Sequence, residues 1–365
     1  MLIAAALATL LLAAPSGQSP TLDRLDGGSR AAALAEIGRD PGAVRHALDD
    51  LIARVDASVH SDRQHPEQRK VEYDRAALGL GNRVGARFAA ATGDTTYARR
   101  FAARQQRLSG TELLNRRRYR AALTPLAAAL REAEALGDTW LELITRVNIA
   151  YGRLQLGDGT RAMAECERAV ALSARLDAKA RALALFNLGS MHLHVGHAAE
   201  SIEYSQQAAA LSRQVGIKLW EGNSLLNIGA AHVQRGEVQA AHDAFRQALD
   251  VLEKTTDQLG IGRAWYNLGL VAVQQHRPAE AAESMERALP IIRAVDIRHS
   301  HDIELAPAAY QNPIELSALQ VLVDAYGALG NKDKQAIHAA ALRRVKARLP
   351  AAGHAHSGAL EPAAR

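Results

Sequence analysis

A forty-residue periodicity is the feature of this sequence that most constrains its fold. A triplet of asparagine, isoleucine or leucine, and a small residue occurs four times, with 39, 40 and 40 residues between successive asparagines. The copies are Asn148-Ile149-Ala150, Asn187-Leu188-Gly189, Asn227-Ile228-Gly229 and Asn267-Leu268-Gly269. A fixed period of this length indicates stacked units, each of which buries its apolar face against its neighbours.

Three further positions keep the same period after the small residue. The first is a turn position, Gly157, Gly196, Gly236 and His276; the next two are small, Ala162, Ser201, Ala241 and Ala281, then Ala169, Ala208, Ala248 and Ala288. Glycine adopts a left-handed turn conformation at little cost. Two small residues seven positions apart share one helical face, where another helix can approach closely. Each period is therefore predicted to be a pair of antiparallel helices joined by a tight turn.

This pattern resembles the tetratricopeptide repeat family over Leu143 to Val295. The usual period of that family is about 34 residues. The longer period here is similar to the repeats of kinesin light chains and of bacterial peptide-sensing regulators. The resemblance implies an all-α fold, a right-handed α-solenoid of antiparallel helix hairpins. The residues agree, because no alternating strand pattern is present and only 4% of the residues are aromatic.

The weaker copies around the four clear repeats define the predicted organisation of the chain. The predicted segments are a signal peptide at 1–20, an N-terminal helical cap with a degenerate repeat at 21–94, a repeat array at 95–297, an insertion loop at 298–313, a capping hairpin at 314–349 and a disordered tail at 350–365. The helices expected outside the clear repeats are Leu22–Leu34, Pro41–Val59, Tyr73–Ala90, Tyr97–Leu108, Leu316–Leu329 and Lys334–Leu349. Gly110, Ala122 and Ala129 add one more copy, with Arg117 at its turn position.

The N-terminal segment has the character of a targeting signal. Leu2 to Ala14 is an uncharged run of 13 residues, which is short for a membrane span and suitable for the core of a signal peptide. Small residues around Ala14-Pro15-Ser16 could form a cleavage site, although no Lys or Arg precedes the run. We therefore expect a periplasmic or secreted protein without a membrane span in its mature form, and a cytoplasmic one if the segment is not cleaved.

The first helix of each repeat carries the predicted binding residues. In the related family these helices line the concave groove, so the resemblance implies that their polar residues contact a peptide. Each asparagine is followed seven residues later, on the same face, by an amide or imidazole and is preceded by an apolar residue. The predicted ladders are Asn148, Asn187, Asn227 and Asn267; Gln155, His194, Gln234 and Gln274; and Val147, Phe186, Leu226 and Tyr266.

Amide side chains offer both donors and acceptors, which match the backbone of an extended peptide. The same asparagines could instead connect adjacent helices. Chaperone-binding relatives hold a terminal carboxylate with cationic and asparagine residues, and the matching positions here are Tyr151, Ser190, Ala230 and Leu270. Recognition of a terminal carboxylate by that route is therefore not expected.

Charge gives one local exception to a balanced composition. The net charge is +5, too small to indicate nucleic acid by itself. Between Arg99 and Arg120, however, eight arginines accompany a single acid, Glu112. The usual interpretation of such a run is a solvated helix surface, and the alternative is contact with an acidic partner or an anionic surface.

Candidate catalytic and metal-binding groups are few. His192, His194 and His197 do not share one helical direction, and His299, His301 and Asp302 lie in the predicted insertion without further ligands at suitable spacing. The only cysteine, Cys166, falls on an inward face and is expected to be a buried apolar residue. No phosphate-binding loop or nucleophile motif is present.

We therefore expect a protein without enzymatic activity or cofactor, an interaction scaffold that binds a protein or an extended peptide. Two alternatives stay open: a detached periplasmic sensor that acts through a signalling partner, and an enzyme with a metal in the insertion. The sequence does not indicate the oligomeric state.

Overall fold

The computed structural model describes residues 19–58, 67–300 and 313–347, which contain sixteen α-helices and no β-strand. The predicted signal peptide, most of the predicted insertion and the predicted tail lie outside these residues. The chain divides into two compact units, one of Met1–Ala231 with Lys254–Thr256 and the other of His232–Glu253 with Asp257–Arg365. No helix among the described residues is long and apolar enough to cross a membrane.

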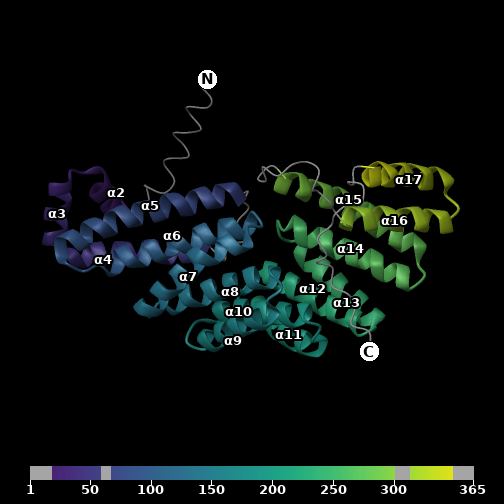
Figure 1. The fold of residues 1–365 in the computed structure, drawn as a ribbon, viewed down its shortest axis with the longest axis horizontal. Coiled ribbons are helices and arrows are strands. Elements are labelled where there is room, and N and C mark those ends of the chain that lie inside the picture. The colour runs from purple at the N-terminus through teal and green to yellow at the C-terminus, as the bar shows by residue number, and fades with distance from the viewer. Residues whose placement is uncertain (1–18, 59–66, 301–312, 348–365) are drawn as a thin grey trace, which may run out of the picture. The chain divides into compact units, whose positions relative to one another are not determined.

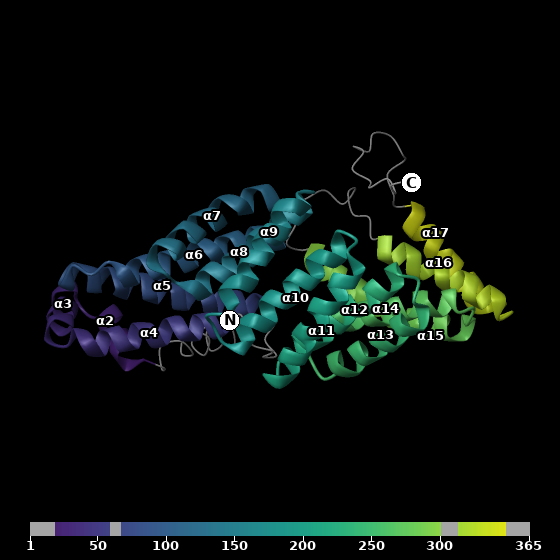
Figure 2. The ribbon, with the colours of Figure 1, turned by 90° about the horizontal axis from the view of Figure 1, so that it is seen from below.

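The first unit is a stack of antiparallel helix hairpins. Its helices are α2 (Pro20–Gly27), α3 (Arg30–Arg39), α4 (Pro41–Ser58), α5 (Glu67–Thr92), α6 (Thr96–Asn115), α7 (Tyr119–Leu136), α8 (Thr139–Gln155), α9 (Gly159–Ser173), α10 (Ala178–His194), α11 (Ala198–Gln214) and most of α12 (Lys218–Gln234). Each helix from α4 to α10 packs against the next, and α2 and α3 pack against α5 (Figures 1 and 2). First helices of successive hairpins also touch, as α6 does with α8 and α8 with α10.

The second unit continues the same pattern within itself. Its helices are α13 (Val238–Leu252), α14 (Gln258–Gln274), α15 (Pro278–Ser300), α16 (Pro313–Ala328) and α17 (Lys332–Ala347). Consecutive helices pack together, and α14 also contacts α16. A core of buried residues from α14 to α17 includes Met285, Leu322 and Tyr326. The predicted fold class, an all-α solenoid of antiparallel helix hairpins, is confirmed.

The turns adopt the left-handed backbone that the repeat pattern predicts. Gly157, Gly196 and Gly236 have φ values of 81°, 84° and 72°. The two residues that replace glycine at this position, Arg117 and His276, are also left-handed, each with φ of 56°. A side chain in this conformation costs roughly 1–2 kcal/mol, so the turn geometry is imposed by the hairpin and not by the residue.

The small residues let the two helices of a hairpin approach closely. A Cβ atom added to Gly189 of α10 would lie 2.5 Å from the Ser205 Oγ and 3.1 Å from the Ser205 backbone nitrogen, both in α11. Gly110 faces Leu126 of α7 and Gly269 faces Met285 of α15 in the same way. All eight small residues predicted on the second helices are fully buried, namely Ala162, Ala169, Ser201, Ala208, Ala241, Ala248, Ala281 and Ala288.

Four helices of the repeats begin at an aspartate cap. The side chains of Asp138, Asp158, Asp177 and Asp257 each accept a hydrogen bond from the backbone N–H three residues later, at the start of α8, α9, α10 and α14. Such a bond satisfies one of the amides that the first turn of a helix leaves unpaired. These caps lie at the inter-helix turns, so the sequence itself marks where these four helices start.

The N-terminal region differs from the sequence prediction. The single helix expected over Leu22–Leu34 is two helices, α2 and α3, because Gly28 is extended with φ of −77° and ψ of 165°. Ser29 then caps α3 by accepting a hydrogen bond from the Ala32 N–H at 3.2 Å. The Gly27-Gly28-Ser29 sequence therefore ends one helix and begins the next.

The hairpin boundaries before the clear repeats also differ. The helix expected to end at Leu108 continues to Asn115, so Tyr97 and Gly110 belong to one helix, α6, which pairs with α7. The helix α15 reaches Ser300, so the first residues of the predicted insertion belong to that helix. The error at Leu108 comes from placing a boundary on a weak repeat match where the helix simply continues.

Candidate functional site

Three of the four first helices of the clear repeats carry one accessible stripe of side chains. In the first unit, Asn148, Tyr151 and Gln155 of α8 are half-buried or exposed, and Asn187, Ser190 and His194 of α10 occupy the same three positions. In the second unit, Asn267, Leu270 and Gln274 of α14 repeat the arrangement. Residues three and seven positions apart lie on one face of a helix, so the predicted pairing of each asparagine with a later amide or imidazole describes one surface. We call these residues the first-helix stripe.

The asparagines of the stripe have different partners. The Asn148 Nδ2 donates to the Thr111 Oγ1 at 3.0 Å, which connects α8 to α6 of the preceding hairpin. The Asn187 Nδ2 instead donates to the Leu183 carbonyl of its own helix at 2.8 Å. Asn148 therefore connects two adjacent helices, which is the alternative role considered in the sequence analysis. The amide of Asn187 instead bonds within its own helix.

The third asparagine is the exception in the stripe. Asn227 of α12 is 4% exposed, and its Nδ2 has no hydrogen-bond partner. A buried donor without a partner costs roughly 1–3 kcal/mol. Asn267 of α14 stays half-buried, as Asn148 and Asn187 do. Gln155, His194, Gln234 and Gln274, predicted to accompany the asparagines, are all exposed.

The apolar residues before the asparagines do not all reach the surface. Val147 and Leu226 are 7% and 1% exposed and belong to the interior, whereas Phe186 and Tyr266 are half-buried. The Tyr266 hydroxyl lies 2.9 Å from the Ser317 Oγ, which connects α14 to α16. Of the four apolar residues that precede the asparagines, Phe186 is thus accessible and, unlike Tyr266, is not hydrogen-bonded to another helix.

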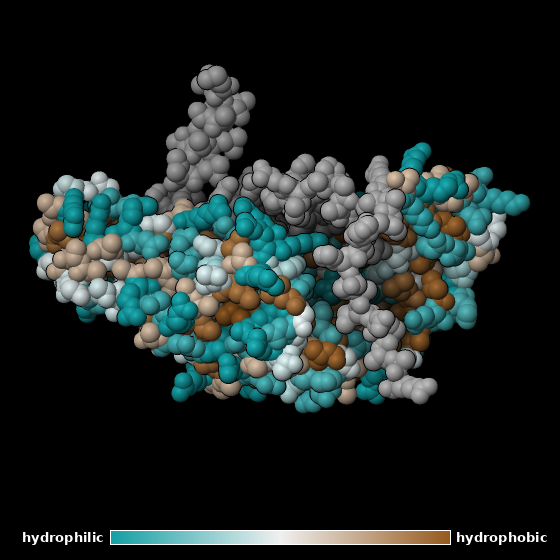
Figure 3. Space-filling view, in the orientation of Figure 1, coloured by the Kyte–Doolittle hydropathy of each residue, from teal (hydrophilic) through white to brown (hydrophobic). Residues whose placement is uncertain are grey.

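Apolar residues do reach the surface elsewhere on the first helices. Tyr151 is 46% exposed, Leu156 at the end of α8 is 42% exposed, and Val273 of α14 is 46% exposed. The space-filling view shows apolar residues gathered over α7 and α8 and over the region of α14, with hydrophilic residues around each (Figure 3). The stripe therefore borders exposed apolar surface.

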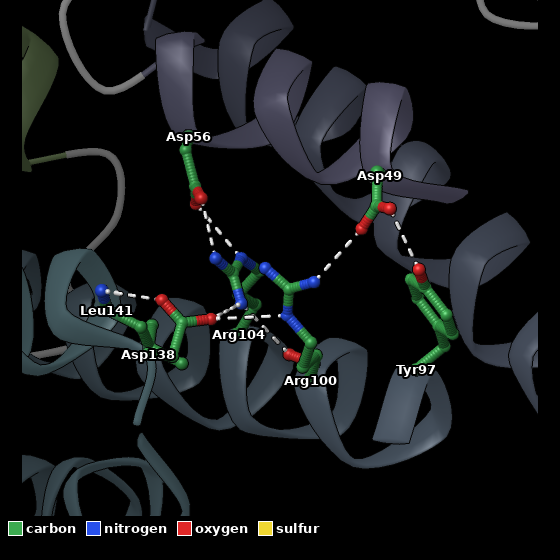
Figure 4. Close-up of polar contacts among 7 residues, drawn as sticks. All are labelled: Asp49, Asp56, Tyr97, Arg100, Arg104, Asp138 and Leu141. Atoms are coloured by element: carbon green, nitrogen blue, oxygen red, sulfur yellow. Dashed lines mark hydrogen bonds and ion pairs between the residues drawn. The ribbon is translucent and has the colours of Figure 1, made fainter. Parts of the chain in front are cut away.

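Two arginines of the run, Arg100 and Arg104, belong to an internal ion-pair network and not to a solvated surface. Arg104 of α6 is 1% exposed, and its guanidinium lies between Asp56 of α4, at 2.5 Å, and Asp138 at the start of α8, at 2.8 Å (Figure 4). Arg100 contacts Asp49 at 3.1 Å and Asp138 at 3.4 Å. These acids come from other helices, so the local charge count along α6 did not include them.

Asp138 has two roles in this network. It accepts a hydrogen bond from the Leu141 N–H at 3.2 Å, capping α8, while it also accepts one from Arg104. Burial alone would raise the pKa of the Asp138 carboxyl, but the charge and hydrogen bond of Arg104 outweigh it and lower that pKa. An aspartate directly before a helix is a sequence signal from which the cap could be predicted. The ion pair with Arg104 could not be predicted in this way, because the two residues lie 34 positions apart in the sequence.

A second buried arginine was also missed by sequence reasoning. Arg146 of α8 contacts Glu134 of α7 at 2.6 Å, Glu142 of its own helix at 2.9 Å and Glu165 of α9 at 2.7 Å. Three carboxylates around one guanidinium tie α7, α8 and α9 together. The network belongs to the packing of the hairpins and leaves no cation available for a ligand.

The histidine cluster separates as the helix geometry predicts. The His194 Nδ1 lies 2.7 Å from the Ser190 carbonyl oxygen, while the Nδ1 atoms of His192 and His197 face each other at 3.4 Å. The described residues contain no group of three or more potential metal ligands. His301 and Asp302, and the side chain of His299, lie outside the described residues, so the metal hypothesis for the insertion is not tested. Cys166 is buried against Ala150 and Leu188, which confirms its apolar role, and burial raises the pKa of its thiol to about 12.

Comparisons with known proteins agree with this architecture. Residues 180–254 and 223–294 match the tetratricopeptide repeat family model. The fold is similar to that of apo RapI, with a TM-score of 0.57 and 12% identity over 83% of this chain and 76% of that one. The repeat resemblance inferred from the sequence is therefore confirmed. A search of curated proteins gave no match.

Two further solved structures show the same fold. A signal-transduction ATPase with a tetratricopeptide repeat sensor, from Pyrococcus horikoshii, has a TM-score of 0.55 and 13% identity over 92% of this chain, which spans 50% of that protein. PilF of Pseudomonas aeruginosa has a TM-score of 0.50 and 15% identity over 68% of this chain and 93% of that one. At these identities the likeness concerns the fold alone.

Proposed function

We propose that this chain, whose residues 180–294 are tetratricopeptide repeats, is a non-catalytic scaffold that binds an extended peptide or a protein partner along the first-helix stripe of α8 and α10 in the first unit. The observation that carries the proposal is the contrast between the two helices of each hairpin. The regular small residues of the second helices are fully buried, whereas the regular polar residues of the first helices, with the exception of Asn227, remain accessible. A repeated polar position that the fold does not bury is available for a ligand.

The chemistry of the stripe suits a peptide main chain. An amide side chain donates through its nitrogen and accepts through its oxygen, as a peptide group does. The exposed Gln155 and His194 stand on successive first helices, α8 and α10, so one extended segment meets several such groups. Accessible Phe186 and Tyr151 offer apolar contacts for peptide side chains.

The sharpest test uses Asn187→Ala with His194→Ala. The full chain is screened against a random peptide display library, and the affinity of a selected peptide is measured by fluorescence anisotropy. The Asn187 amide bonds only its own helix at 2.8 Å, so its removal leaves the hairpin stack intact. We expect the double variant to lose about tenfold or more in affinity, since each lost peptide hydrogen bond is worth about 1 kcal/mol.

Matched controls separate binding from folding. Gln206→Ala changes an exposed residue on a second helix and is expected to leave affinity unaltered. Asn148→Ala removes the bond between α8 and α6 and is expected to lower stability as well as affinity. Failure to select any peptide, or equal affinity of wild type and the Asn187/His194 variant, would overturn the proposal.

A sensor that acts through a signalling partner is the second candidate. A fold relative carries a repeat segment described as a sensor, and stacked hairpins can change their packing along the array. Small-angle scattering with and without the selected peptide distinguishes the two candidates. A change in the radius of gyration on binding supports a sensor, and identical curves support a static scaffold.

We propose further that the protein is exported. The support is the uncharged run from Leu2 to Ala14 with small residues after it. Expression in a bacterium followed by fractionation and mass spectrometry tests it. A periplasmic product beginning near Ser16 is expected, and an uncleaved product confined to the cytoplasm would contradict it.

A further inference from the structure

The second half of the arginine run has a different environment from the first half. Arg116, Arg117, Arg118 and Arg120 are all exposed, at the turn between α6 and α7 and on the first turn of α7. Among the residues that the structure describes, these four side chains form no ion pair, whereas Arg99, Arg100 and Arg104 all do. Within the described part of the chain, the charge of this turn is therefore not neutralised by ion pairs.

One of these arginines occupies its position at a conformational cost. Arg117 has φ of 56° where the next two hairpins have Gly157 and Gly196. Glycine adopts this left-handed conformation without that cost. Strained non-glycine positions cluster at functional sites, and the Arg117 side chain is exposed at this turn.

Aromatic and apolar groups lie beside the uncompensated charge. Tyr119 packs edge-on against Tyr151 of the first-helix stripe, with ring centroids 6.1 Å apart. Burial and neighbouring Tyr119 raise the pKa of Tyr151, and Arg117 is close enough to oppose that rise. Tyr151 and Leu156 remain 46% and 42% exposed. The basic turn thus adjoins one end of the stripe in α8.

We propose that this basic–aromatic surface, formed by Arg116, Arg117, Arg118, Arg120, Tyr119, Tyr151 and Leu156, binds an acidic segment of the peptide or protein partner that also inserts an apolar side chain. The inference deepens the proposed function and rests on it. Guanidinium groups pair with carboxylates, and exposed tyrosine rings accept apolar side chains.

The observations favour a peptide over other anionic partners. A nucleic acid needs cations along an extended track, and here four arginines lie within five residues. The exposed apolar groups instead provide the contacts that a mixed acidic and apolar peptide needs.

The test measures binding and stability together in Arg117→Gly. The probe is a short fluorescein-labelled peptide of glutamates around one central phenylalanine, and glutamines replace the glutamates in its control. We expect Arg117→Gly to bind the acidic probe about two- to fivefold more weakly, as the loss of an exposed ion pair allows, while its thermal midpoint stays equal or rises. The triple variant Arg116→Gln, Arg117→Gly and Arg118→Gln is expected to lose about tenfold or more.

His276→Gly is the matched control, because it relieves the same backbone conformation at a turn of the other unit. It is expected to raise the midpoint without changing affinity for the acidic probe. Equal binding of the acidic and glutamine probes, or unchanged binding by the triple variant, would overturn the inference. Tighter binding to phosphatidylglycerol vesicles or to a single-stranded oligonucleotide than to the acidic probe would also overturn it.

The outcomes separate this inference from the function on which it rests. If Asn187→Ala with His194→Ala weakens a library-selected peptide while the arginine variants bind the acidic probe normally, the stripe binds peptides and the basic surface has no part in it. If no peptide is selected at all, the proposed function itself fails.

Discussion

Two regions of the first unit stack helix hairpins by different chemistry. In the ion-paired region, formed by α4, α6 and the start of α8, Arg104 is held between Asp56 and Asp138. In the small-residue region, formed by α10 and α11, Gly189 lies directly against Ser205 with no ion pair across the contact. The first kind of contact depends on charge neutralisation and the second on the absence of side-chain volume.

The difference teaches which changes each region tolerates. A buried arginine is stable only while its carboxylates remain, and the removal of one partner leaves an uncompensated charge. A close helix contact is stable only while no atom is added between the helices. The ion-paired region should therefore be destabilised by loss of a charged partner, and the small-residue region by added side-chain volume.

The largest effect is expected from Arg104→Met. The change leaves Asp56 and Asp138 without their cation in a buried setting, where breaking a pair costs about 3–5 kcal/mol. Urea denaturation measures the loss, and amide hydrogen exchange should localise it to α4, α6 and α8. Arg99→Met is the control, because its pair with Glu132 is 44% and 42% exposed and is worth at most about 1 kcal/mol. Equal losses from the two variants would contradict the importance of burial.

A smaller loss is expected from Gly189→Ala. Alanine favours a helix over glycine by about 1 kcal/mol, but its Cβ would lie 2.5 Å from the Ser205 Oγ and must displace α11. We expect a net destabilisation of about 1–3 kcal/mol in urea denaturation. Gly38→Ala in α3 is the control, because nothing lies within 4 Å of its added Cβ and it should stabilise by about 0.5–1 kcal/mol. If both glycine variants were stabilised, close packing would not explain the repeat glycine.

Acid should affect the two regions in different pH windows. The pKa of Asp138 is lowered on folding, so its stabilising contribution is present above the unfolded value of about 3.9 and is lost as the pH falls through the lower folded value. Burial lowers the pKa of His192 in α10, so its contribution is lost as the pH falls below about 6.5. Hydrogen-exchange protection should therefore decrease first at the α10–α11 turn and only below about pH 4 in the ion-paired region.

His192→Phe gives the matching control for this experiment. It keeps a ring beside Tyr204, with which His192 stacks at 5.2 Å, and removes the titrating group. The step near neutral pH should disappear in this variant while the step below about pH 4 remains. Loss of both steps would mean that the two regions unfold together.

The smallest effect is expected from His276→Gly, and it is a gain. The left-handed backbone at φ of 56° costs a side chain roughly 1–2 kcal/mol, part of which the greater freedom of glycine in the unfolded chain offsets. A stabilisation of up to about 1 kcal/mol should raise the thermal midpoint. The reverse change, Gly196→Ala in the small-residue region at φ of 84°, should lower it. A lower midpoint for His276→Gly would show that the imidazole makes a contact worth more than the backbone strain.

Much of the fold could be predicted because its signals are local and repeated. The turn positions, the eight buried small residues and the aspartate caps all depend on residues within one hairpin. The errors fall where the repeat weakens: Gly28 divides a predicted helix, and α6 continues past Leu108. The candidate site was predicted as a set of positions, but its accessibility was not, since Asn227 and Leu226 are buried while Asn187 and Phe186 are half-buried.

The sequence by itself determined that the chain is an array of helix hairpins, because a period of 40 residues with glycine and alanine at fixed positions permits little else. Only the tertiary structure decided which arginines are buried in ion pairs and which are exposed. Arg104 and Arg117 are both arginines of the same arginine-rich run. The side chain of Arg104 is buried between two carboxylates, whereas that of Arg117 is exposed at a strained turn. The physical reason is distance along the chain. Asp56 and Asp138 lie 48 and 34 residues from Arg104 and meet it only when the hairpins stack.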